Sequence, residues 1–277
     1  MRSGLLRSGS RVGRAIASGT VAAAVVLGGC APDPAPPAAD VPRFDVEIVG
    51  TSPHDTGAFT QGLEIDGDRL LEGTGREGRS RVTASDRETG DVLTEADLPA
   101  PLFGEGITVA GDTVWQLTWQ DGIAVARDRE TLLERRRVDY DGEGWGLCLD
   151  ESSAGSSGRL VMSDGTDTLT FRDPVTFEPT GTVRVTQGER PVTSINELEC
   201  TADGVYANIW KTDDIVRIDP STGAVTAIVD ASPLRAALDD TSGIDVLNGI
   251  AAVPGTSRFL VTGKLWPTLF EVEFRPR

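Results

Sequence analysis

Phe103-Gly104-Glu105-Gly106-Ile107 is one of five copies of a short pattern that ends in Leu or Ile and is followed, after a turn, by a second apolar run. The copies end at Leu63, Ile107, Leu147, Leu198 and Ile250, and are therefore spaced by 44, 40, 51 and 52 residues. Such spacing, with several short strands per repeat, is typical of the blades of a β-propeller. The sequence therefore predicts an all-β chain folded as a five-bladed β-propeller.

The last repeat is one strand short of a full blade. Residues Arg43 to Val49 alternate apolar and polar side chains, as a half-buried strand does. We expect this N-terminal strand to pair with the C-terminal strand at Leu269 to Phe274 and so close the ring. The propeller domain would then span residues 43–277, which is ample for one all-β domain, and we expect it to be a monomer.

Two positions of the repeat do not keep one residue type. Two residues before each Leu or Ile stand Gln61, Glu105, Trp145, Asn196 and Asn248. Five residues into each second run stand Gly75, Trp119, Gly165, Trp210 and Lys264. Packing positions of a repeat usually keep one residue type, because every blade solves the same packing problem. These two registers are therefore predicted to form two rings around one binding mouth, the alternative being that they merely fill the channel.

The N-terminus has the features of an export signal. Residues 1–29 carry four arginines and no acid, and end in an apolar run before Leu27-Gly28-Gly29-Cys30, which resembles a bacterial lipobox. We expect residues 1–29 to be a lipoprotein signal peptide and Cys30 to become the lipidated N-terminus, anchoring an exported lipoprotein at the bacterial cell surface. An ordinary secretion signal with an incidental cysteine is the alternative. Residues 30–42, rich in Pro and Ala, should form a semi-extended tether.

The net charge of the chain excludes one class of binding partner. Its formal net charge is -17, whereas nucleic-acid binding needs a basic surface, so we expect no nucleic-acid partner. We expect contact with a membrane only through the lipid at Cys30. An acidic surface instead suits ligands with a cationic group, such as the free ammonium end of a peptide.

Two cysteines lie in the repeat-starting strands of neighbouring blades. By the repeat alignment, Cys148 and Cys200 occupy successive registers and so point to opposite faces of their own strands. Facing strands of adjacent blades could bring the two sulfurs together, and an exported protein permits the bond. The sequence predicts this disulfide, with two buried free thiols as the alternative.

The sequence lacks the residues that several common catalytic mechanisms require. The only histidine is His54, in a Ser-Pro-His-Asp turn that we expect at the surface. A Ser or Cys triad needs a histidine base beside the nucleophile, and a catalytic zinc site needs a ligand cluster. We therefore expect neither a metal nor another cofactor. What remains is Glu105 as the one acid of the first ring and Lys264 as the one cation of the second.

The motifs together resemble the plant and bacterial type of glutaminyl-peptide cyclotransferase, over essentially all of residues 43–277. The segments that carry the resemblance are Phe-Thr-Gln-Gly-Leu (59–63), Phe-Gly-Glu-Gly-Ile-Thr (103–108), Leu-Thr-Trp (117–119), Glu-Gly-Trp-Gly-Leu (143–147), Asn-Glu-Leu-Glu (196–199), Ala-Asn-Ile-Trp (207–210), Leu-Asn-Gly-Ile-Ala (247–251) and Thr-Gly-Lys-Leu-Trp-Pro (262–267). One departure is residues 72–78, where the family usually has Ser after Glu72 and an aromatic residue near Glu77, so the substrate contacts at that rim are open.

The resemblance implies a metal-independent, five-bladed enzyme that converts the N-terminal glutamine of peptides or proteins into pyroglutamate and releases ammonia. It implies that Glu105 is the catalytic carboxylate and that Lys264 and Asn196 act beside it. The pocket residues that it implies are Phe59, Gln61, Phe103, Trp119, Trp145 and Trp210.

The residues fit this chemistry by themselves. The substrate's own amine attacks its carboxamide, so a single general acid and base is enough, and Glu105 takes that role. Burial should raise the pKa of Glu105 and Lys264 should lower it, and the sequence does not decide between them. Gln61 and Asn248 are expected to bind the substrate amide or backbone. The competing hypothesis is a non-catalytic, surface-anchored propeller that binds peptides or sugars, while a propeller lactonase is disfavoured because its metal ligands are missing.

Overall fold

The computed structural model describes residues 40–152 and 158–277. The predicted signal peptide at residues 1–29, the lipidation site Cys30 and most of the predicted tether lie outside the described residues. None of the helices in the described part has the length and apolar character that crossing a membrane requires.

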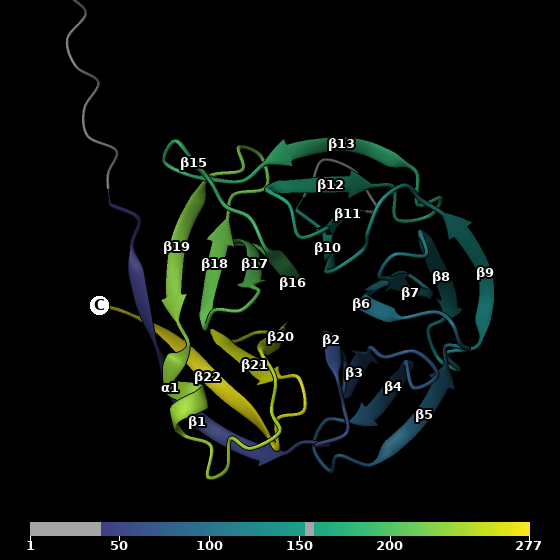
Figure 1. Ribbon diagram of the computed structural model, residues 1–277, viewed down its shortest axis with the longest axis horizontal. Helices are drawn as coiled ribbons and strands as arrows, with labels where there is room; N and C mark the ends of the chain where they lie inside the picture. Colours follow the sequence, from purple (N-terminus) through teal and green to yellow (C-terminus); the bar gives the residue numbers. More distant parts are fainter. Residues whose placement is uncertain (1–39, 153–157) are drawn as a thin grey trace, which may run out of the picture. The chain divides into compact units, whose positions relative to one another are not determined.

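Apart from one short helix, α1 (Ser232–Ala236), the described chain is all-β, and it includes a two-stranded hairpin of β14 (Thr186–Gln187) and β15 (Arg190–Pro191) beside its larger sheets. Figure 1 shows its sheets arranged as a ring. Three sheets have four antiparallel strands each, in chain order. They are β2 (Thr60–Asp66), β3 (Arg69–Thr74), β4 (Arg81–Asp86) and β5 (Val92–Asp97); β6 (Gly104–Ala110), β7 (Thr113–Thr118), β8 (Ile123–Asp128) and β9 (Glu134–Asp139); and β10 (Leu147–Asp150), β11 (Arg159–Met162), β12 (Thr168–Arg172) and β13 (Pro179–Arg184). The architecture is propeller-like.

The remaining strands form one eight-stranded sheet that contains both ends of the domain. Its strands are β16 (Ile195–Thr201), β17 (Gly204–Ile209), β18 (Asp214–Ile218), β19 (Val225–Asp230), β1 (Arg43–Pro53), β22 (Thr268–Pro276), β21 (Arg258–Gly263) and β20 (Leu247–Ala252). β1 pairs antiparallel with β22, with Phe44 opposite Pro276 and Ile48 opposite Val272, which confirms the predicted pairing of the two terminal strands. The other edge of β1 pairs parallel with β19, a contact that the repeat pattern did not predict.

The first strands of the repeats surround the centre of the ring and contact one another in the circular order β2, β6, β10, β16, β20 and back to β2 (Figure 1). In four of the five repeats the residue that follows the first-ring position is glycine. A Cβ on Gly62 would lie 2.5 Å from the Ile107 nitrogen, and one on Gly106 would lie 2.7 Å from the Leu147 nitrogen. The glycines of the motif are therefore needed because neighbouring inner backbones approach too closely for a side chain.

The fourth repeat has Glu197 where these repeats have glycine. Its side chain is 1% exposed. One carboxyl oxygen accepts a hydrogen bond from the Leu63 nitrogen at 3.2 Å, and the other accepts from the Ile250 nitrogen at 2.9 Å. Burial raises the pKa of Glu197 well above its ordinary value, although these two backbone hydrogen bonds oppose the rise. Glu197 therefore ties the inner strands β16, β2 and β20 together near the centre of the ring.

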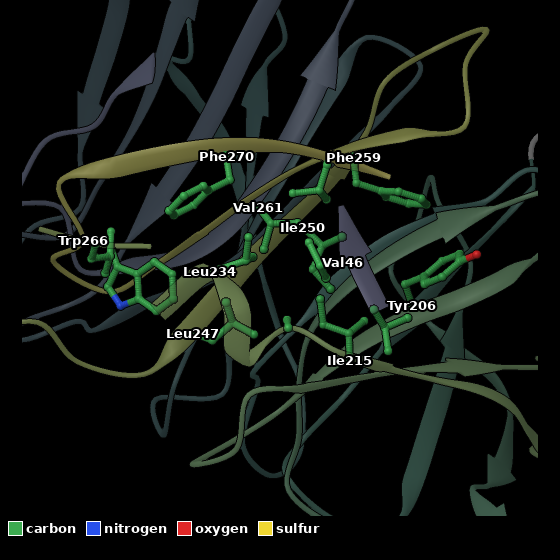
Figure 2. Packing of buried hydrophobic residues seen from close by; sticks show 14 residues of the cluster. Val46, Tyr206, Ile215, Leu234, Leu247, Ile250, Phe259, Val261, Trp266 and Phe270 are labelled. Atoms are coloured by element: carbon green, nitrogen blue, oxygen red, sulfur yellow. The ribbon is translucent and has the colours of Figure 1, made fainter. Parts of the chain in front are cut away.

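Apolar side chains fill the space around the eight-stranded sheet. Figure 2 shows Val46 of β1, Tyr206 of β17 and Phe259 of β21 in one buried cluster. The Phe259 ring stacks on Phe274 with centroids 4.6 Å apart. This packing holds the N-terminal strand against the strands of the fourth and fifth repeats, because the apolar surface of each strand is removed from water only when all of them assemble.

Cys148 on β10 and Cys200 on β16 form a disulfide, with their Cα atoms 5.4 Å apart. The predicted bond is confirmed, and the alternative of two free thiols is wrong. Because the two cysteines belong to adjacent inner strands, the bond links two neighbouring sheets across a sequence separation of 52 residues.

Candidate active site

A cavity of about 340 Å³ opens at the end of the ring where the inner strands begin and the second strands end. It is lined by Phe59, Gln61, Phe103, Glu105, Trp119, Trp145, Asn196, Trp210, Lys211, Asp245, Val246 and Lys264. Nine of these are residues that the sequence predicted. The two registers of the repeat therefore do meet around one opening, although they are far apart in the chain.

Glu105 is the second residue of β6 and is only 4% exposed. Its Oε1 accepts a 2.8 Å hydrogen bond from the Gln61 side-chain amide. Burial raises the pKa of Glu105 well above its ordinary value; the charge of Lys264 opposes this rise and the charge of Glu143 adds to it. The structure thus decides what the sequence left open, since desolvation outweighs the lysine. A carboxyl group of this kind can exchange a proton closer to neutral pH than an exposed glutamate can.

Lys264 directly follows β21 and is 5% exposed. Its ammonium lies 4.8 Å from the centroid of the Phe59 ring, in a cation–π arrangement. Burial lowers the pKa of Lys264, whereas the charges of Glu105 and Asp245 oppose that change. The cavity therefore holds one buried proton-exchanging acid and one buried cationic hydrogen-bond donor.

The aromatic side chains of the cavity form two groups of touching rings. Phe103 lies edge-on to Phe59, with centroids 6.2 Å apart, and contacts Trp119 at 5.7 Å. Trp145 and Trp210 form the second group, with centroids 5.5 Å apart and planes at 84°. Trp119 and Trp210 remain 37% and 36% exposed at the opening. The rings therefore form an apolar wall that reaches from the buried acid to the surface.

The two asparagines of the first ring have different positions. Asn196 is 2% exposed and lines the cavity. Asn248 is fully buried and does not line it. Its Nδ2 donates to the Thr60 carbonyl oxygen at 3.0 Å and to Oε1 of Gln61 at 3.4 Å. The structure therefore places Asn248 behind Gln61, where it holds the amide that bonds Glu105, and not at the substrate-facing position expected from its register.

The glycines of the second ring make room for the aromatic wall. A Cβ on Gly75 would lie 2.3 Å from the Phe103 ring, and one on Gly165 would lie 2.7 Å from the Trp145 ring. A larger residue in either repeat would displace a ring from the cavity. The glycines in the second ring therefore have a steric reason: the Phe103 ring fills the space beside Gly75, and the Trp145 ring fills the space beside Gly165.

Four residues near the opening were not assigned from the sequence. Lys211 lines the cavity, and its ammonium lies 3.9 Å from the Trp210 ring centroid. Asp245 and Val246 also line it. Glu143 accepts hydrogen bonds from the indole nitrogens of two wall tryptophans. A third register of the repeat could have found part of this set, because Phe59, Phe103, Glu143 and Val246 each stand two residues before a first-ring residue.

His54 is not the surface residue that its turn suggested. Its side chain is 7% exposed. Nδ1 lies 2.8 Å from the Trp266 carbonyl oxygen and Nε2 lies 3.1 Å from Oε1 of Glu72. Burial lowers the pKa of His54, but the hydrogen bonds to Glu72 and Trp266 and the charges of Glu72 and Asp55 together outweigh it, and the net direction is upward. The turn packs against the last repeat, which sequence context alone did not reveal.

A larger cavity, of about 890 Å³, lies at the opposite ends of the inner strands and contains none of the predicted catalytic or substrate-binding residues. Three of its acids are Glu64, Asp66 and Glu199. Across residues 40–152 and 158–277, no group of three or more His, Cys, Asp or Glu side chains could hold a metal ion. We therefore place the candidate active site at the aromatic opening.

The chain is similar to known proteins over most of its length. Residues 21–274 match the family described as glutamine cyclotransferase. The chain is 37% identical over 235 residues to the glutaminyl-peptide cyclotransferase of Arabidopsis thaliana, a match that covers 83% of this chain and 72% of that protein. It also superposes on the crystal structure of Myxococcus xanthus glutaminyl cyclase with a TM-score of 0.78 and 39% identity, covering 86% of this chain and all of the other.

Proposed function

The chain belongs to the glutamine cyclotransferase family and has glutaminyl-peptide cyclotransferase function, and from this premise we propose that Glu105 is its general acid and base. The observation that carries the proposal is the position of Glu105: an acid that is 4% exposed, with a raised pKa, in a cavity walled by aromatic rings. The substrates are peptides or proteins with an N-terminal glutamine, and the reaction is an intramolecular acyl transfer.

The proposed reaction needs one proton to move twice. The α-amine of the substrate attacks the side-chain carboxamide carbon, and Glu105 accepts the proton that this nitrogen loses. This attack closes the ring; Glu105 then returns the proton to the amide nitrogen, the old C–N bond breaks, and ammonia leaves. General acid and base catalysis of this kind typically contributes about 10² to 10⁴ in rate. The cycle starts from the carboxylate form of Glu105 and a neutral substrate amine, so the raised pKa of Glu105 and the pKa of that amine together set the lower pH limit of activity.

Lys264 and Asn196 are proposed to donate hydrogen bonds to the carboxamide oxygen as negative charge develops there. Both side chains are almost completely buried and line the same cavity as Glu105. Fixed donors in a water-poor site stabilise such charge more than water does, because they need no reorganisation during the reaction.

The remaining cavity residues are proposed to act through position. The aromatic wall would exclude water and hold the glutamine side chain folded back on its amine, which supplies proximity. Gln61, held by Asn248, would keep the Glu105 carboxyl group directed into the cavity. All of the proposed steps use side chains of this chain, with no metal ion or cofactor.

Two further proposals concern the whole molecule. Counting the eight-stranded sheet as two blades, β16 to β19 and β20 to β22 with β1, gives five blades; the circle of five contacting inner strands supports this count. The lipobox-like Leu27-Gly28-Gly29-Cys30 supports export and anchoring through a lipid on Cys30.

The test of the proposed function is an assay of the purified protein with a short peptide that begins with glutamine. We expect release of ammonia and a product that has lost the mass of one ammonia, in buffer that contains a strong chelator. A matched peptide with N-terminal asparagine is the control, because its shorter side chain would have to close a smaller ring. Binding of the glutamine peptide without ammonia release would instead identify a peptide-binding module.

A further inference from the structure

The aromatic wall is interrupted at one point. Contacts between rings join Phe59, Phe103 and Trp119, and a separate contact joins Trp145 and Trp210. The gap between these groups falls between the sheet of β6 to β9 and the sheet of β10 to β13. Trp119 directly follows β7, and Trp145 stands two residues before β10.

Glu143 occupies this gap. In the first two repeats the equivalent residues are Phe59 and Phe103, which both belong to the wall. Oε2 of Glu143 accepts a 2.9 Å hydrogen bond from the Trp119 indole nitrogen and another, also of 2.9 Å, from the Trp145 indole nitrogen. Oε1 accepts a third from the Gln120 side-chain amide at 2.9 Å. One carboxylate thus joins the two groups of rings.

The backbone fixes where this carboxylate stands. The Gly144 nitrogen donates to the Trp119 carbonyl oxygen at 2.9 Å, and the Trp145 nitrogen donates to the Ser163 carbonyl oxygen at 3.0 Å. A Cβ on Gly144 would lie 2.2 Å from the Tyr140 hydroxyl oxygen, so this segment has little freedom to move. The Glu143 side chain is therefore presented to both indoles by a rigid connection.

We propose that Glu143 is a positioning residue that fixes the rings of Trp119 and Trp145 and so makes the substrate-binding wall continuous. Trp119 is 37% exposed, and without an anchor its indole N–H would bond to water in several ring orientations. Hydrogen bonds to an ionised acceptor are stronger than neutral ones, so a single carboxylate can hold both rings. This inference rests on the proposed function in one respect, because it takes the wall to hold the glutamine substrate near Glu105.

The negative charge of Glu143 also affects the pKa of Glu105, so the pH dependence of activity offers a second test of the proposal. Three groups interact electrostatically with Glu105. They are Lys264 after β21, Glu143 before β10, and the half-buried Tyr140 after β9, whose hydroxyl donates to the Thr118 carbonyl oxygen at 2.5 Å. Of the two that shift Glu105, Lys264 lowers its pKa and Glu143 raises it. Removing the charge of Glu143 should therefore move the acidic limb of the activity profile to lower pH.

Two substitutions separate position from charge. In Glu143→Gln the amide oxygen has two lone pairs and can accept from both indoles, while Gln120 can flip its amide to accept from the new NH₂ group. Glu143→Ala removes all three hydrogen bonds. Asp121→Asn is the matched control, because it neutralises an exposed acid beside Gln120 that does not line the cavity.

The measurements are kcat and KM on a glutamine peptide, the pH profile of kcat/KM, and quenching of tryptophan fluorescence by acrylamide. Trp115 and Trp266 are fully buried and give a constant background. We expect Glu143→Ala to lower kcat/KM on the order of 10²-fold, since small misplacement of a bound substrate costs about this much, and to increase quenching. Glu143→Gln should keep wild-type quenching, stay within a few-fold in kcat/KM, and shift the acidic limb to lower pH. Asp121→Asn should change none of these three quantities.

Two results would overturn the proposal. One is Glu143→Ala with wild-type kcat/KM and wild-type quenching. The other is Glu143→Gln as impaired as Glu143→Ala with an unmoved pH limb, because Glu143 would then act in the chemistry and not through the rings. The proposed role of Glu105 is tested separately. If activity survives Glu105→Gln while the Glu143 variants still alter quenching, the role of Glu105 is wrong and the role of Glu143 in fixing the rings stands.

Discussion

The side-chain amide of Gln61 donates a 2.8 Å hydrogen bond to Oε1 of Glu105, and the two residues occupy the same register in neighbouring repeats. Repeat symmetry explains this contact, because equivalent positions of adjacent inner strands lie side by side around the centre of the ring. Asn248, again from the same register, holds the oxygen of Gln61. Three repeats thus fix the orientation of one carboxyl group.

Replacing Glu105 by Gln should abolish most turnover. The amide keeps the volume of the side chain but cannot accept a proton, so we expect kcat to fall by about 10² to 10⁴ while KM stays within a few-fold. Pyroglutamate formation from a glutamine peptide measures this. Gln61→Ala is the companion variant, expected to lose less because it only frees the orientation of Glu105. Near wild-type kcat for Glu105→Gln would refute the assigned mechanism.

Replacing Lys264 by Met should impair catalysis and move its pH dependence upward. Met keeps the length of the side chain but removes the charged donor, which we expect to cost on the order of 10² in kcat. Because Lys264 lowers the pKa of Glu105, its loss raises that pKa further, and the acidic limb of the kcat/KM profile shifts to higher pH. This shift is opposite in sign to the one expected for Glu143→Gln. A limb that does not move would show that the two groups are uncoupled.

Replacing Glu197 by Ala should destabilise the domain without touching the cavity at the aromatic opening. The Leu63 and Ile250 N–H groups would lose their acceptors in a buried place, and each unsatisfied group costs about 1–3 kcal/mol. We expect the free energy of unfolding to fall by about 2–5 kcal/mol in urea titrations. Glu197→Gln, which retains one acceptor, should lose less. Equal stability of all three proteins would contradict the proposed connection between inner strands.

Glu64→Gln should make the protein more stable at alkaline pH than the wild type. Burial raises the pKa of Glu64 to about 7, with the Thr108 hydrogen bond opposing the rise. The folded state therefore binds this proton more tightly than the unfolded state, and the wild type loses stability as pH rises from about 4.5 to about 7. The Gln side chain can still bond Thr108, because the hydroxyl can donate or accept.

The Glu64 prediction is tested by measuring the stability of the wild type and of Glu64→Gln at two pH values. At pH 4 the two proteins should unfold at the same urea concentration, and at pH 8 the variant should be more stable by on the order of 1–3 kcal/mol. A constant difference at both pH values would mean that the substitution changes packing and not ionisation.

Cys30→Ala should release the protein from the membrane fraction without changing its activity. The prediction follows from the lipobox-like end of residues 1–29 and from the Pro-rich segment that separates Cys30 from the domain. Cell fractionation followed by the pyroglutamate assay tests both parts. Membrane association that persists in the variant would argue against anchoring at this cysteine.

The sequence by itself determined the features that depend on register. Five copies of one pattern predict a ring of similar sheets, and variable residues at fixed repeat positions predict which side chains meet, because equivalent positions occupy equivalent places around an axis. Glu105, Lys264 and the tryptophans were found in this way. The pairing of Cys148 with Cys200 and of β1 with β22 followed from the same alignment.

Tertiary structure alone decided the contacts that cross between repeats at unequal positions. The sequence did not reveal that Glu143 accepts from two indoles, that Asn248 stands behind Gln61, or that His54 is buried against Trp266. Nor could it give the direction of the pKa of Glu105, because desolvation and the opposing charge of Lys264 both depend on distances in three dimensions. Periodicity fixes where each backbone position lies, whereas these properties depend on which side chains reach one another once the sheets have packed.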